Sequence, residues 1–175
     1  MLLNLEESSV PMRRVYLFTE EIKHDPSYVE EVQNLTLDTS RPTMGLKGTH
    51  GLFCSEEWWA SIREGRIPLK FVSGIIQRIY VTGQDAGVVN NTIDLVLEDG
   101  TKVSTGIYTN DKRDVALFCL GHKAEIVYAL DELKCPPEEE AWYYSETALE
   151  MAVSEDPIEG NGKIKGVSDG LNYYQ

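Results

Sequence analysis

The sequence predicts a mainly β protein of the α+β class, built on a small five-stranded antiparallel barrel of the OB or SH3-like kind or on a strongly bent sheet. Two observations predict this class. Short apolar runs alternate with turn signals from residue 69 to residue 134, without a long helical pattern between them. Gly74 follows Ser73 inside the first run, where a residue without a Cβ favours a bulge, a bend or a close neighbouring chain. A sandwich-like meander is the alternative.

The expected strands follow one another through this unit. Ile93, Leu95 and Leu97 alternate with more polar residues, which is typical of a strand with one buried and one wet face. Asp99 and Gly100 tolerate positive φ and therefore predict a tight hairpin turn. We expect strands over residues 69–81, 92–98, 102–108, 115–120 and 124–130.

Residues 13–153 are expected to form a single globular domain around this unit, after a loosely ordered segment at 1–12. A strand over 13–19 is predicted to join the sheet. Asp25 and Pro26 are typical of a helix start, because aspartate caps free amides and proline lacks an N–H that the first turn does not use.

The clearest helical pattern runs from Ser55 to Gly65. Ser55 is a good N-cap, and Gly65 can adopt the left-handed conformation that ends many helices. Trp58 or Trp59, together with Ile62, gives the helix an apolar face. We expect this single helix to cover one open end of the barrel.

The remaining segments are less regular. Residues 36–51 are rich in Thr, Gly, Pro and Ser, and they predict a long loop that is functional or conceals a strand. Residues 138–153 predict a helix with an acidic first turn, although their alternation also permits a strand. Residues 154–175 are Gly-rich and polar, and we expect a tail or a terminal hairpin.

Composition and charge narrow the function classes. The chain has 175 residues and a net charge of −13, and residues 135–175 hold 9 acidic but only 2 basic side chains. This balance disfavours nucleic acid and favours a basic protein partner. The longest apolar run is too short for a membrane helix and the start lacks a signal-peptide pattern, so we expect a cytoplasmic protein with no membrane partner.

Four residues have metal-ligand character, but we expect neither a metal nor another cofactor. The spacings His50-x3-Cys54 and Cys119-x2-His122 bring histidine near cysteine, yet they match no zinc module. Cys119 falls within the apolar strand expected over 115–120 and is better explained as a small core residue.

An enzyme is the alternative that Cys54 suggests. A thiol at the start of a helix has a lowered pKa because of the helix dipole, and His50 or His122 would act as its base. The hypothesis is a small cysteine- and histidine-dependent enzyme that uses residues 36–54. The sequence contains no phosphate-binding loop, nucleophile elbow or H-E-x-x-H motif.

The leading hypothesis is a non-catalytic protein-binding module, such as an inhibitor or an immunity-type protein against a basic partner. Three adjacent aromatic residues cannot all be buried by one helix, so we expect an exposed surface or a contact between copies of the chain. A second alternative is single-stranded nucleic-acid binding on the barrel. The predicted binding residues are Glu138, Glu139, Glu140, Trp142, Tyr143 and Tyr144.

Overall fold

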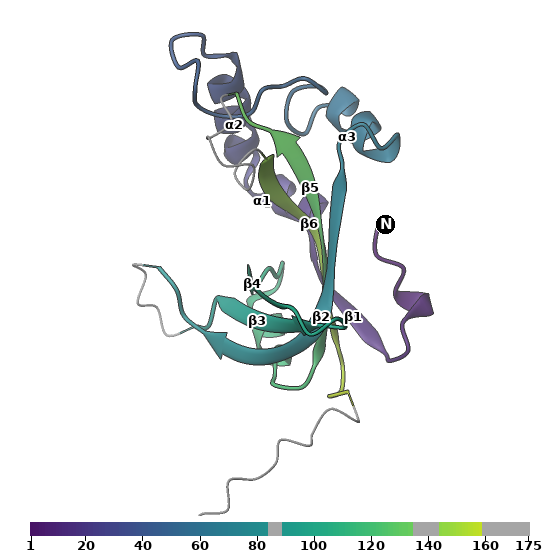
Figure 1. Cartoon of the computed structure of the whole chain (residues 1–175). Coiled ribbons are helices and arrows are strands. Elements are labelled where there is room, and N and C mark those ends of the chain that lie inside the picture. The colour runs from purple at the N-terminus through teal and green to yellow at the C-terminus, as the bar shows by residue number, and fades with distance from the viewer. Residues whose placement is uncertain (84–88, 135–143, 159–175) are drawn as a thin grey trace, which may run out of the picture.

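The structure is a computed structural model, and it describes residues 1–83, 89–134 and 144–158 (Figure 1). Its centre is one antiparallel sheet of six strands in the order β1-β6-β5-β2-β3-β4. The mainly β class is therefore confirmed. The strands are β1 Met12–Leu17, β2 Leu69–Tyr80, β3 Thr92–Leu97, β4 Lys102–Gly106, β5 Lys123–Glu132 and β6 Tyr144–Ser154.

The structure does not confirm a five-stranded barrel of the OB or SH3-like kind, because the sheet has six strands and is open. Residues 69–134 supply four of the six strands, and the other two come from outside this unit. β6 pairs with β5 along residues 124–132 and so occupies the edge that β5 would need to close a barrel. β1 then pairs with the other edge of β6.

β2 is the long strand that joins the two parts of the sheet. Its first part pairs with β5 and its second part, from Gly74 onward, pairs with β3. Figure 1 shows that β2 curves between them, so that β3 and β4 lie across the direction of β5 and β6. A Cβ on Gly74 would lie 2.8 Å from the carbonyl oxygen of Val96, which confirms a close neighbouring chain at this glycine.

Local signals located several elements correctly. Gly100 has φ 85° in the tight turn between β3 and β4, as the Asp-Gly pair predicts. The Asp25 carboxylate and the Ser55 hydroxyl cap α2 and α3 by accepting backbone N–H groups. The helices are η1 Leu5–Glu7, α1 Phe18–His24, α2 Pro26–Leu37, α3 Glu56–Arg63 and η2 Lys112–Leu117, where η marks a 3-10 helix.

The predicted strand over residues 115–120 was wrong. Residues 112–117 form the 3-10 helix η2 because the Asp111 carboxylate accepts the backbone N–H of Arg113 and starts a helical turn. Cys119 follows this helix and is exposed, so it is not the small core residue that the apolar run predicts.

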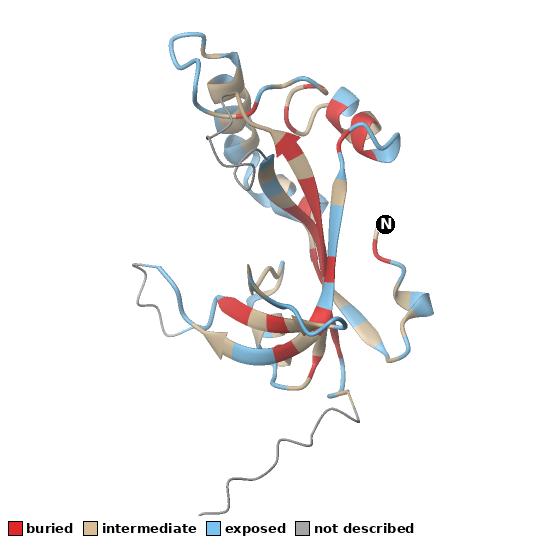
Figure 2. Cartoon of the chain, viewed as in Figure 1, coloured by how far each residue is buried: buried red, intermediate tan, exposed pale blue. Residues whose placement is uncertain are grey.

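The predicted C-terminal helix was wrong where the structure describes it, and the alternative of a strand is confirmed, because residues 144–154 form β6. β6 lies between β1 and β5, and every residue from Ala148 to Ser154 is buried (Figure 2). Pairing on both edges satisfies the backbone, and burial of this run outweighs the helix preference of its Ala, Leu, Glu and Met residues. Residues 138–143 lie outside the described residues.

The helix α3 packs at one end of the sheet rather than over the mouth of a barrel. Trp58 is fully buried against Phe18 and Phe53, and the ring centroids of Trp58 and Phe53 are 5.2 Å apart. Its indole Nε1 donates a 2.7 Å hydrogen bond to Asp131 of β5. This bond fixes α3 to the sheet through a buried polar pair.

The segment before β1 is held to the sheet by one buried carboxylate. Glu150 of β6 accepts the backbone N–H groups of Leu2 and Leu3, at 2.7 and 3.1 Å, and it pairs with Arg14 at 3.2 Å. Arg14 also donates to the Leu3 carbonyl. No local pattern in residues 1–12 predicts these contacts.

Candidate protein-binding site

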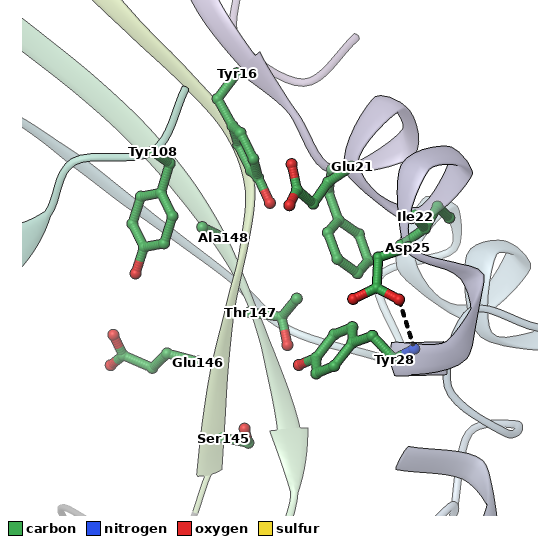
Figure 3. Close-up of a pocket in the computed structure, with 11 residues that line it drawn as sticks. Tyr16, Glu21, Ile22, Asp25, Tyr28, Tyr108, Ser145, Glu146, Thr147 and Ala148 are labelled. Carbon is green, nitrogen blue, oxygen red and sulfur yellow. Dashed lines mark hydrogen bonds between the residues drawn. The ribbon is translucent and has the colours of Figure 1, made fainter. Parts of the chain in front are cut away.

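A cleft of about 360 Å³ opens between the two N-terminal helices and the first half of β6 (Figure 3). Its walls combine tyrosine rings with carboxylates, and none of the lining residues is basic. The lining residues are Tyr16, Phe18, Glu21, Ile22, Asp25, Tyr28, Tyr108, Ser145, Glu146, Thr147 and Ala148.

The junction of β1 and α1 builds one wall of this cleft. The sequence predicts a strand as far as residue 19, but β1 ends at Leu17 and α1 starts at Phe18. The ladder between β1 and β6 shifts register just before Tyr16. The chain therefore turns from Tyr16 into a helix that carries Glu21 beside the same hollow (Figure 3).

The Asp25 carboxylate is held in place by the start of α2. Its Oδ1 accepts the Ser27 hydroxyl at 2.5 Å and the Tyr28 backbone N–H at 3.3 Å. These two hydrogen bonds lower the pKa of Asp25, so this side chain is negatively charged at neutral pH. Both bonds use one oxygen, and no hydrogen bond to Oδ2 is found among the described residues.

Tyrosine rings form the other part of the lining. The rings of Tyr16 and Tyr108 have centroids 5.5 Å apart, and Tyr28 packs edge-on against Phe53. Burial, followed by the nearby charge of Glu21, raises the pKa of Tyr16, so its hydroxyl stays protonated. Tyr16 is only 7% exposed, but within the described part of the chain its hydroxyl makes no hydrogen bond.

The electrostatic field of the cleft is negative. Of its three carboxylates, Glu146 is paired with Lys70, with 2.6 Å between Nζ and Oε1. Glu21 receives one long contact of 3.5 Å from the Asn110 amide, and within the described residues no cation pairs with Glu21 or Asp25. A cation from outside is therefore attracted to the side of the cleft that α1 and α2 form.

Most of the predicted binding residues, Glu138, Glu139, Glu140, Trp142 and Tyr143, lie outside the described residues. Tyr144 is described, is 40% exposed and is the first residue of β6. It directly precedes Ser145, which lines the cleft. The segment selected from the sequence thus leads straight into the candidate site.

The metal and cysteine candidates are not brought together. Within the described residues, no group of three or more His, Cys, Asp or Glu side chains is placed to hold a metal ion. His122 is buried and its Nδ1 lies 2.8 Å from the carbonyl oxygen of Ser154, whereas Cys119 is exposed. His50 is half-buried in the loop before α3.

The prediction of a lowered pKa at Cys54 was wrong. Burial raises the pKa of this thiol to about 12. Cys54 precedes the N-cap of α3 by one residue, has φ 61° and is half-buried against the core. A buried thiol in this state is poorly ionised, and the geometry does not favour it as a nucleophile.

The acidic, tyrosine-lined cleft can attract a cationic group of a protein partner. The model of the family described as immunity protein RhsI2 matches residues 12–154, which run from the first residue of β1 to the last of β6. The chain belongs to this family and is an immunity-type protein-binding module. A search of curated proteins finds no match.

Sequence reasoning missed most of the cleft. Asp25 was recognised only as a helix cap, and Tyr108 only as the last residue of the strand expected over 102–108. Tyr16 and Glu21 had no signal of their own, because they reach the same hollow only after β1 pairs with β6. A clue was present in the acidic first turn of α1, which lies close to Asp25 in the sequence.

Proposed function

We propose that the protein binds a toxin protein and thereby neutralises it, with the cleft between α1, α2 and β6 at the centre of the contact. The single observation that carries this proposal is the family match, which covers all six strands and the elements that build the cleft. The name of the family implies protection, and protection of this kind requires a bound toxin.

We further propose that the toxin is basic and is met in the cytoplasm. The net charge of −13 and the negative cleft support a basic contact surface on the partner. Among the described residues, no helix is long and apolar enough to cross a membrane.

The test is to express the chain with the toxin encoded by the neighbouring gene and to measure both binding and protection. We expect a stable complex by light scattering after gel filtration, and growth of cells that make the toxin together with this protein. Absence of a complex at micromolar concentrations of both proteins would contradict the proposal.

Hydrogen exchange then locates the contact. Toxin binding is expected to slow amide exchange in α1 and in residues 144–148 of β6, and to leave the β3–β4 hairpin unchanged. Glu21→Lys places a cation in the cleft and is expected to weaken binding. Glu30→Lys is the matched control, because Glu30 is also exposed, lies on α2 and does not line the cleft.

A further inference from the structure

Three groups face the cleft, each with an oxygen that receives no hydrogen bond among the described residues. Figure 3 shows the Tyr16 hydroxyl and the carboxylates of Glu21 and Asp25 on the sides of the same hollow. Asp25 Oδ2 and Glu21 Oε1 receive no hydrogen bond, because the bonds to these side chains reach the other oxygen of each carboxylate. The cleft is thus equipped to accept several hydrogen bonds at one point.

The Tyr16 hydroxyl is the observation that points to a ligand. Tyr16 is more than nine-tenths buried, and its hydroxyl, which makes no hydrogen bond within the described residues, reaches the cleft (Figure 3). This hydroxyl can therefore accept a hydrogen bond from a ligand in the cleft. Neighbouring carboxylates require that the same ligand carry positive charge.

The tyrosine rings that line the cleft also attract a cationic ligand. Tyr108 stands beside Tyr16, and Tyr28 forms the opposite rim of the hollow (Figure 3). The face of a tyrosine ring attracts a lysine ammonium or an arginine guanidinium at distances up to about 6 Å from its centroid. The cleft volume of about 360 Å³ admits one such side chain and its methylene stem.

We propose that this cleft receives one cationic side chain, a lysine or an arginine, from the toxin, which donates hydrogen bonds to the Tyr16 hydroxyl and to the Glu21 and Asp25 carboxylates. This inference rests on the proposed function, because it supplies the anchor of the same contact. Ordered charge pairs at the centre of an interface are typical anchors, whereas charges at the rim contribute little affinity.

Two substitutions that preserve the shape of the side chain test whether the cleft anchors a cationic side chain of the toxin. Tyr16→Phe removes only the hydroxyl, and Glu21→Gln removes only the charge. Each is expected to raise the dissociation constant for the toxin about 10-fold or more, as expected for the loss of a hydrogen bond to a charged group. Glu30→Gln, outside the cleft, is the control and should leave the dissociation constant unchanged.

The outcomes separate this inference from the proposed function. If the wild-type chain does not bind the toxin, both fail. If the wild type binds and the two variants bind equally well, the anchor is overturned and the immunity function stands. A lower unfolding temperature of Tyr16→Phe with unchanged affinity would show that the hydroxyl serves the fold, and would also overturn the anchor.

Discussion

At the scale of single residues, the buried environment of Asp131 disfavours the charged form of its side chain. It is 3% exposed and accepts the indole N–H of the fully buried Trp58. Burial raises the pKa of Asp131, and the hydrogen bond from Trp58 opposes this rise without cancelling it. The residue therefore stabilises the fold as an acceptor, while its charge is a cost.

We expect Asp131→Asn to keep the acceptor and to change the free energy of unfolding at pH 7 by no more than about 1 kcal/mol, whereas Asp131→Ala loses about 1–3 kcal/mol. Because the folded-state pKa is raised, the folded protein binds the proton more tightly. Wild type should thus lose stability relative to the Asn variant as pH rises from about 4 through the raised pKa. Urea unfolding across this range measures the difference, and a rise in relative stability would contradict it.

The Cys54 thiol gives a second prediction at this scale. With a pKa of about 12, Cys54 should react with iodoacetamide at pH 8 at least about 100-fold more slowly than an ordinary thiol. Its reaction rate should still increase above pH 10. Mass spectrometry of a Cys135→Ser variant compares Cys54 with the exposed Cys119. Equal rates at pH 8 would show that Cys54 is accessible and ionised.

At the scale of elements, the stability of the fold around β6 depends on the buried carboxylate of Glu150. Glu150→Ala would leave Arg14 and two backbone N–H groups without their acceptor, so we expect a loss of about 3–5 kcal/mol of unfolding free energy. Glu146→Ala, on the same strand, removes an exposed pair with Lys70 and should cost less than about 1 kcal/mol. Chemical unfolding of both variants checks the contrast, and similar losses would refute it.

The crossing of β2 and β3 depends on Gly74. An added Cβ would lie 2.8 Å from the Val96 carbonyl oxygen and 3.1 Å from Leu95, so the two strands must separate. We expect Gly74→Ala to destabilise the protein by about 1–3 kcal/mol, as overpacking does. Ser73→Ala, at the adjacent exposed position, is the control in thermal unfolding. A neutral Gly74→Ala would mean that β2 and β3 are less close than the structure shows.

At the scale of the whole molecule, the net charge of −13 governs how fast a basic partner arrives. We expect the association rate with the toxin to fall about 10-fold between roughly 0.05 M and 0.5 M salt, because screening removes long-range attraction. The dissociation rate should change much less, since the short-range contacts of the formed complex are screened less than the long-range attraction. Surface plasmon resonance measures both rates, and an association rate independent of salt would argue against a basic partner.

Much of the local structure was predictable from the sequence alone. The hairpin at Asp99 and Gly100, the cap of α2 at Asp25 and the cap of α3 at Ser55 all depend on bonds between residues a few positions apart. Such interactions form in the same way wherever the segment lies in the molecule, so their residues are sufficient to predict them. The acidic charge excess is likewise a property of composition, and it favours a module that binds a basic protein.

Only the tertiary structure determined how the strands pair and which residues line the cleft. Residues 144–154 have the composition of a helix and became a central strand, because β1 and β5 bury both of their edges. That same pairing brings Tyr16 beside Tyr108 and places Glu21 and Asp25 over the start of β6. Local sequence determines short-range hydrogen bonds, whereas burial and pairing between distant segments determine which side chains share one cleft.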